Sequence, residues 1–205
     1  LTGPMKAWQM LDRPIYDLTS KYEPEDRAVT KQEALLMSGL STQAFAGTIR
    51  MALLGAWAVS ELLEEIGLQL WDLKWEFAVD GDDLFFVDTI DADSFRATGT
   101  VPVDGRQLII HYNKQAMRDY YRIICATWYA GVNAAKQEAA VSGAPFKEVL
   151  KAGQAAGKYP PTPEVDAAFL DLQARKTALI KEHVLGETDA ATVRAGLVEA
   201  GLAEA

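Results

Sequence analysis

Charged side chains alternate with large apolar ones over residues 68–77. Asp72, Lys74 and Glu76 share one face of this segment, and aromatic or leucine side chains occupy the other face. A period of two is typical of a half-buried β-strand, whose two faces meet different surroundings. The segment therefore places carboxylates and an amine together on one side of a predicted strand.

The next residues predict the return strand of a β-hairpin. Residues 80–83, Asp-Gly-Asp-Asp, favour a turn, and residues 84–90 fit a second strand. A turn of odd length would put Glu76 and Asp88 on the same face. The hairpin 68–90 is the clearest sheet element in the sequence.

Carboxylates continue beyond the hairpin, because Asp91 and Asp93 follow Asp88 closely. Hard cations such as Mg²⁺ take oxygen ligands, and one or two carboxylates with substrate phosphates are a common arrangement in ATP chemistry. A solvated strand face followed by an acidic turn explains the same spacing equally well. The spacing alone leaves both interpretations open.

A second group of candidates lies at the start of a predicted helix. Asn113 can cap this helix, so that Lys114 and Gln115 fall in its first turn and Arg118 one turn later on the same face. The free N–H groups of a helix start favour an anion. Taken by themselves, however, Lys114 and Arg118 are more often solvent-facing charges.

Four segments, in order along the chain, resemble motifs of the SAICAR synthetase family. They are 14–21 (PIYDLTSK, similar to P-I-F-x-x-T-T-K), 72–78 (DLKWEFA, similar to D-F-K-L-E-F-G), 88–96 (DTIDADSFR, similar to D-E-I-S-P-D-T-C-R) and 113–120 (NKQAMRDY, similar to S-K-Q-x-x-R-D-Y/W). Four motifs in one order are much harder to obtain by chance than one. With a Pro-rich break at 160–164, the resemblance extends over about residues 10–186.

This resemblance implies an ATP-dependent ligase of purine biosynthesis. The family joins the carboxylate of a phosphoribosyl carboxyaminoimidazole to the amino group of aspartate, with ATP and Mg²⁺. The implied partners are the imidazole ribotide, aspartate and ATP. The chain could also associate with a separate nucleotide-binding chain or with a second copy of itself.

The resemblance also implies roles for individual residues. Those that would bind the nucleotide are Lys21, Glu76 and Asp88, of which Glu76 and Asp88 would also hold Mg²⁺. The catalytic residues would be Lys74 and Asp93. Substrate would be bound by Asp93, Ser94, Arg96, Lys114, Gln115 and Arg118.

The sequence departs from the family at three places in these motifs. Thr89 stands where the family has Glu, Asp91-Ala92 replaces Ser-Pro, and Ala78 replaces Gly. The charge lost at position 89 could be supplied by Asp91. These changes also leave room for a related ATP-dependent amide ligase with another acid and amine, or for a degenerate, non-catalytic binding subunit.

A larger departure concerns the nucleotide-binding lobe that precedes the first of these motifs in the family. This chain has no counterpart of it, and it begins at Leu1 without an initiator Met. The expectation is that the lobe lies on another polypeptide or that the chain is part of a longer protein.

The elements that position these residues predict an α+β fold, an antiparallel sheet around the 68–90 hairpin packed with helices. Thr30 and Ser41 are expected to cap two helices before the hairpin, the second ending at Gly67. The elements expected after it are a polar loop over 91–107, a strand over 108–112 and helices over 113–140, 146–154 and 163–186. A domain over residues 1–186 would be followed by a helical tail, 187–205.

Composition limits the classes of partner. The 205 residues carry a formal net charge of -9, which argues against binding to a nucleic-acid backbone. One cysteine and two histidines provide neither a disulfide nor a structural zinc site. No signal peptide or apolar run of about 18 residues is apparent, so we expect a cytoplasmic protein that does not associate with a membrane.

Overall fold

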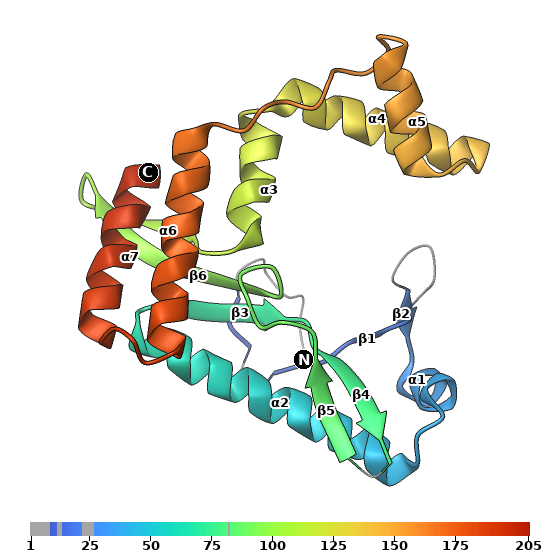
Figure 1. Ribbon diagram of the computed structural model, residues 1–205, viewed down its shortest axis with the longest axis vertical. Coiled ribbons are helices and arrows are strands. Elements are labelled where there is room, and N and C mark those ends of the chain that lie inside the picture. The colour runs from blue at the N-terminus through green and yellow to red at the C-terminus, as the bar shows by residue number, and fades with distance from the viewer. Residues whose placement is uncertain (1–8, 12–13, 22–26, 82) are drawn as a thin grey trace.

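The computed structural model describes residues 9–11, 14–21, 27–81 and 83–205. Its strands are β1 (Leu18–Thr19), β2 (Ala28–Val29), β3 (Gln69–Leu73), β4 (Glu76–Asp80), β5 (Asp83–Val87), β6 (Phe95–Val103) and β7 (Arg106–His111). Its helices are α1 (Lys31–Ser38), α2 (Thr42–Glu65), α3 (Lys114–Ile123), α4 (Ala126–Ser142), α5 (Phe146–Ala155), α6 (Ala167–Val184) and α7 (Ala190–Glu204). Helices and antiparallel strands together confirm the α+β prediction (Figure 1).

The strands of the described residues form three small antiparallel sheets. β3, β6 and β7 make the largest, in the order β3-β6-β7, whereas β4 and β5 pair only with each other, as do β1 and β2. The segment 68–77 is therefore two strands and not one, separated at Lys74 and Trp75. The predicted hairpin exists as β4 and β5, with Asp82 of its turn outside the described residues, and it lies beside the main sheet.

The hairpin departs from the main sheet because it packs on α2. The indole N–H of Trp75 donates to the carbonyl of Ala52 on that helix (3.1 Å). A Cβ at Gly47 would lie 2.9 Å from a methyl of Leu84, and one at Gly55 would lie 2.9 Å from the Trp75 ring. Two glycines on one side of α2 thus allow the hairpin to approach its backbone closely.

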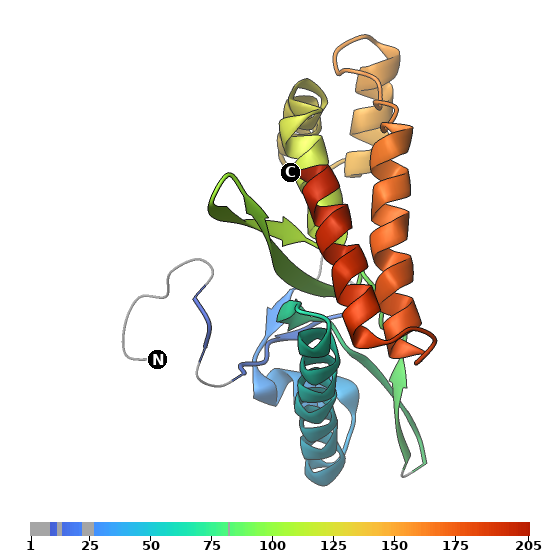
Figure 2. The same ribbon diagram turned by 90° about the vertical axis from the view of Figure 1, so that its left-hand side faces the viewer.

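The main core lies between the three-stranded sheet and the helices that cover it. Figures 1 and 2 show α6 and α7 side by side against β6. The buried residues of this core come from α2 and the segment after it, from β6, from β7 and the residue after it, and from α6 and α7: Leu63, Ile66, Leu68, Phe95, Ala97, Val101, Ile110, Tyr112, Ile180, Val193 and Leu197. Leu70 and Leu73 of β3 are partly buried against it. The helix after residue 187 is therefore packed into the core, while the division into domains at residue 186 stays a prediction.

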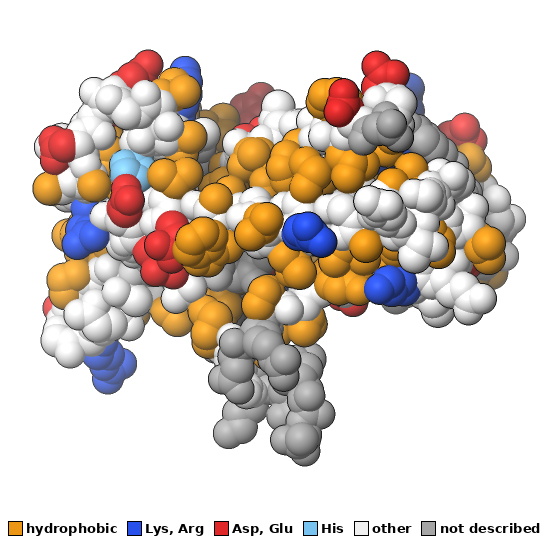
Figure 3. Space-filling model, turned by 90° about the horizontal axis from the view of Figure 1, so that it is seen from below, with side chains coloured by type: hydrophobic (Ala, Val, Ile, Leu, Met, Phe, Trp, Pro, Cys, Tyr) orange, Lys and Arg blue, Asp and Glu red, His pale blue; other side chains and the backbone are white. Residues whose placement is uncertain are grey.

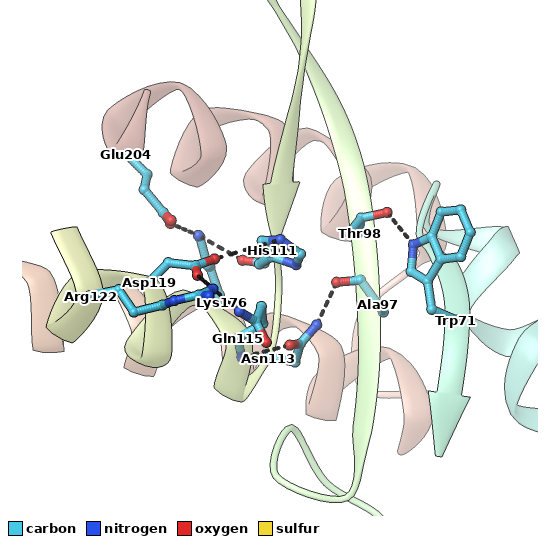
Figure 4. Close-up of polar contacts among 10 residues, drawn as sticks. All are labelled: Trp71, Ala97, Thr98, His111, Asn113, Gln115, Asp119, Arg122, Lys176 and Glu204. Carbon is cyan, nitrogen blue, oxygen red and sulfur yellow. Dashed lines mark hydrogen bonds and ion pairs between the residues drawn. The ribbon is translucent and has the colours of Figure 1, made fainter. Parts of the chain in front are cut away.

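The polar loop predicted over 91–107 is wrong, because most of it is β6, the middle strand of the main sheet. Phe95, Ala97 and Val101 alternate toward the core, and the Thr98 hydroxyl accepts the indole N–H of Trp71 on β3 (2.8 Å, Figure 4). Pro102 causes no break because β3 pairs with β6 only as far as Thr98.

The single helix predicted over 113–140 is also wrong. α3 ends at Ile123 and α4 begins at Ala126, and the backbone of Cys125 between them is not helical (φ -101°, ψ 35°). The Tyr120 carbonyl accepts the N–H groups of both Ile124 and Cys125 (2.8 and 3.3 Å). Figure 1 shows α4 and α5 projecting from the body as an arm after this change of direction.

Tyr120 explains both this bend and the late start of α6. Its ring stacks on Phe169 of α6 (centroids 4.4 Å apart), and its hydroxyl accepts the N–H of Asp166 (3.1 Å). Asp166 in turn caps α6 by accepting the N–H of Ala168 (2.7 Å). The helix predicted from Pro163 therefore begins at Ala167.

The predicted caps are confirmed at three helix starts. Thr30 accepts the N–H of Glu33 (3.2 Å), Ser41 that of Ala44 (3.1 Å), and Asn113 that of Gln115 (2.8 Å). Each satisfies a backbone donor that has no partner inside its helix. The cap at Asn113 fixes the start of α3.

α2 is the most apolar helix at the surface. Over Thr42–Glu65 it is long and apolar enough to cross a membrane by length and composition, with 6% of the window buried. Such a helix is weak evidence for a membrane span, because helices of soluble proteins also pass this test. Its exposed apolar residues include Leu54 and Trp57, and Figure 3, seen from the side on which α2 lies, shows a band of hydrophobic side chains.

Candidate active site between the hairpin and the start of α3

Three charged residues meet where β4 begins. The carboxylate of Glu76 contacts the ammonium of Lys21, which follows β1, and its Oε1 lies 3.3 Å from Nζ of Lys74. The hydrogen bond from Lys21, and then that from Lys74, lowers the pKa of Glu76 below its ordinary value of 4.5. Glu76 is therefore an ionised carboxylate at neutral pH that holds two lysines on one side.

We expect the Glu76→Gln variant to lose part of the acid sensitivity of the folded state. Because the folded pKa of Glu76 is lowered, its stabilising contribution is complete above 4.5 and is lost as the pH falls through the folded pKa. The free energy of unfolding, measured in urea between about pH 6 and pH 3, should fall less steeply in this variant than in the wild type. Glu61→Gln, on the exposed side of α2, should follow the wild type. Parallel curves for Glu76→Gln and the wild type would contradict the ion pairs as the cause.

The loop after β5 is held by its own aspartates. Asp88 adopts a left-handed backbone (φ 81°), and its Oδ1 accepts the N–H of Thr89 (2.9 Å). Asp91 accepts the N–H of Asp93 (2.8 Å), the N–H of Ser94 (3.2 Å) and the hydroxyl of Thr89 (3.0 Å). These bonds, first that from Asp93, lower the pKa of Asp91. Asp91, whose carboxylate could supply the charge lost at position 89, therefore already stabilises the conformation of this loop.

The same loop is attached to the start of α3. The backbone N–H of Lys114 donates to the Ala92 carbonyl (2.9 Å), and its ammonium contacts the Asp93 carbonyl, with the Asp93 carboxylate 4.0 Å away. The side chain of Asp93 is 88% exposed. A carboxylate and an ammonium are therefore available to a ligand at the start of a helix.

A cavity of about 280 Å³ opens beside this pair. Its lining comes from the loop, from the start of α3 and from α6: Ala92, Asp93, Tyr112, Asn113, Lys114, Met117, Gln173, Lys176 and Thr177. Among the charged residues of this lining, Lys114 and Asp93 are accessible to a ligand, whereas Lys176 is 1% exposed and paired with Glu204.

A backbone contact joins the two charged groups, which are Lys21, Lys74 and Glu76 in the first and Asp93 and Lys114 in the second. The N–H of Lys74 donates to the carbonyl of Ser94 (2.8 Å), which places the Lys74 end of the first group beside the loop of the second. Arg96 is the second residue of β6, two after Ser94, and its Nη2 lies 2.7 Å from Oδ2 of Asp72 across the β3–β6 ladder. The candidate residues thus form one continuous region.

The comparisons with known proteins agree with the motifs in this region. The sequence profile of SAICAR synthetase matches residues 1–135, the part of the chain that contains every residue of both charged groups. This chain belongs to the SAICAR synthetase family. The family is one of ligases in purine biosynthesis.

Two relatives illustrate how much of the family this chain covers. A curated protein of Archaeoglobus fulgidus, provisionally named phosphoribosylaminoimidazole-succinocarboxamide synthase, is 30% identical over 134 residues, which are 64% of this chain and 38% of that protein. A solved structure of phosphoribosylaminoimidazole-succinocarboxamide synthase from Ehrlichia chaffeensis is 21% identical, with a TM-score of 0.45, over 75% of this chain and 54% of that one. The chain therefore spans about two fifths to half the length of these relatives.

The structure brings together most of the residues that the family resemblance implies. Lys21, Lys74 and Glu76 meet directly, and Asp93 meets Lys114. The others lie around them. Asp88 and Ser94 are in the loop after β5, and Arg96 forms an ion pair with Asp72. On α3, the amide of Gln115 donates to Asp119 (2.9 Å) and Arg118 is exposed. Their individual roles in this SAICAR synthetase family member stay predictions.

A magnesium site in this family member stays a prediction as well. Within the described ranges no group of three or more Asp, Glu, His or Cys side chains could hold a metal ion. Asp80 pairs with Asp83 and Glu76 with Val87, so the odd-length turn that would put Glu76 and Asp88 on the same face is not found. Both predicted ligands nevertheless lie near the open end of the hairpin. Any ion there would need further oxygens from a ligand.

Two contributing residues were missed from the sequence. Asn113 was identified only as a cap, yet its amide also donates to the Ala97 carbonyl on β6 (2.6 Å). The motifs assign no role to Lys176, although it lies four residues before the core residue Ile180 and therefore on the apolar face of α6. A lysine on that face is the signal that could have identified it.

Proposed function

We propose that this chain carries the substrate-side half of a ligase that joins aspartate to a phosphoribosyl carboxyaminoimidazole with ATP. The observation that supports this most is the hydrogen bond from Lys74 to Ser94, because it joins the two charged groups into one site. One group offers cations for phosphate, and the other offers the ammonium of Lys114 beside the exposed carboxylate of Asp93. Ligation of an acid to an amine through ATP needs both.

Each group has a task in this reaction. The carboxylate receives a phosphoryl group from ATP, and the amine then displaces phosphate to form the amide. Lys21 and Lys74, oriented by Glu76, stabilise the negative charge of the transferred group. Lys114 at the start of α3 binds an anionic group of the substrate, and Asp93 takes the proton that the amine loses on attack.

Glu76 and Asp88 would hold Mg²⁺ together with phosphate oxygens of the nucleotide. Their oxygens are of the type that Mg²⁺ prefers, and one or two carboxylates with phosphates are a common ligand set. When bound, the ion would neutralise charge on the phosphates.

The nucleotide-binding lobe is proposed to come from sequence outside these 205 residues. The A. fulgidus relative is longer, since the matched segment is 38% of it. The exposed apolar residues of α2 and β5, among them Trp57 and Phe85, offer a surface on the hairpin side of the site that such a lobe could cover.

The test is ADP release by the chain together with the part of the A. fulgidus relative that it does not cover. ADP should appear only when Mg²⁺, ATP, the carboxyaminoimidazole ribotide and aspartate are all present, and Asp93→Asn should lower the rate at least about 100-fold. Asp104→Asn, in the turn between β6 and β7, is the matched control and should keep the rate. ADP release with a different acid and amine would indicate a related ligase. Absence of ADP release with every pair, from a complex shown to be folded, would indicate a non-catalytic subunit.

A further inference from the structure

Lys176 is a fully buried lysine beneath the candidate site. It lies on α6, its side chain is 1% exposed, and its ammonium contacts the carboxylate of Glu204 on α7 (Figure 4). The ammonium also donates to the His111 carbonyl (3.2 Å) and lies 4.9 Å from the centre of the Tyr112 ring. A lysine is almost never buried to this extent without a specific partner.

The contacts of Lys176 fall on the junction between β7 and α3. His111, Tyr112 and Asn113 are consecutive there, and each forms a hydrogen bond with a residue of another helix or strand. The His111 carbonyl accepts from Lys176, the Tyr112 hydroxyl donates to the Leu197 carbonyl (2.7 Å), and the Asn113 amide donates to Ala97 (2.6 Å). The next residue is Lys114, so this junction determines where the first turn of α3 lies.

The helices that hold the junction lie outside the part of the chain that the family profile covers. The profile ends at residue 135, whereas Lys176 and Glu204 belong to α6 and α7. Lys176 also lines the cavity beside Asp93 and Lys114. Lys176 and Glu204 therefore support the site from a part of the chain that follows the profile match.

We propose that Lys176, paired with Glu204, is a positioning residue that fixes the β7–α3 junction and so holds the ammonium of Lys114 where it binds an anionic group. The inference rests on the proposed function only for the identity of that ligand, since the binding itself is tested with sulfate.

The charge on Lys176 can be switched by pH. Burial lowers the pKa of Lys176 to about 8, so the ammonium loses its proton between about pH 7 and pH 9. Of the titratable groups that face it from the other elements, neither His111 nor Tyr112 changes its charge in this range. Glu204 on α7 and Asp119 on α3 are carboxylates, burial lowers the pKa of His111 on β7 so that it stays neutral, and burial raises the pKa of Tyr112 to about 12.

Sulfate binding to the whole chain tests this proposal, because sulfate keeps its charge across the range. The dissociation constant is measured from the amide NMR shifts of Lys114 and Gln115 at pH 7 and pH 9. Wild type should bind about threefold to tenfold more weakly at pH 9, and Lys176→Met should bind about tenfold more weakly at pH 7 and show no pH step. Lys181→Met, exposed on the same helix, should behave as wild type.

A folded Lys176→Met variant with the wild-type dissociation constants at both pH values would overturn the proposal. So would a wild type that binds no sulfate at these amides, and neither result would decide the ligase assay. If Lys176→Met does not fold, Glu204→Gln replaces it. Removal of the Glu204 charge disfavours the ammonium, so the pH step should move to lower pH by about half a unit or more. An unmoved step would also refute the positioning role.

Discussion

Replacement of Leu197 by alanine is expected to lower the free energy of unfolding by about 2–5 kcal/mol. Leu197 is 2% exposed and lies in the core shared by α7 and the main sheet. Its backbone carbonyl accepts the Tyr112 hydroxyl, so the backbone there cannot move freely to fill the space that the side chain leaves. The cost follows from the lost transfer of the side chain out of water and from the cavity that remains.

Urea unfolding followed by circular dichroism measures this change. Leu202→Ala is the matched control on the same helix, because Leu202 is 45% exposed, and it should change the free energy by no more than about 0.5 kcal/mol. Equal, small effects of the two variants would show that residues 187–205 are a dispensable tail. The expected difference would instead show that α7 is an integral part of the fold.

Lys114→Met is expected to weaken binding of the anionic substrate about 10- to 100-fold. A charge-assisted hydrogen bond contributes about 1.5–3 kcal/mol, and methionine keeps the length of the side chain while removing its charge and its donors. The variant also releases the loop, because the Lys114 ammonium contacts the Asp93 carbonyl. Both effects act on affinity more than on overall stability.

Isothermal titration of the ribotide into the chain measures the affinity, and thermal unfolding measured in parallel tests that the fold is kept. Lys147→Met is the control. Lys147 is an exposed residue of α5, so this variant makes the same change of charge away from the site and should keep the wild-type affinity. If both variants lost affinity equally, net charge alone would explain the binding. If neither did, the start of α3 would not be the anion site.

Local chemistry was predictable wherever a few neighbouring residues decide it. Thr30, Ser41 and Asn113 cap the helices that they were expected to cap, because the side-chain oxygen and the N–H that it accepts are two or three residues apart. The turn chemistry of 80–83 and the alternation around it likewise predicted β4 and β5. The motifs identified the family because they too are short runs of residues.

The pairing of strands was not predictable in this way. The alternation over 68–77 continues without interruption, yet the chain leaves the main sheet at Trp75 because that ring packs on α2 beside Gly55. β6 was missed because Gly99 and Pro102 favour a loop locally, whereas its pairing with both β3 and β7 is a long-range interaction.

The sequence by itself determined the charged residues, the caps, the α+β class and the family to which the motifs belong. Only the tertiary structure decided that Glu76 joins Lys21 and Lys74, that Asp91 shapes the loop and that Lys176 is buried beneath the start of α3. The physical reason is that capping and alternation act over a few residues. Burial and ion pairing depend on which distant segments share a core, as α6 and α7 do with β6 and β7.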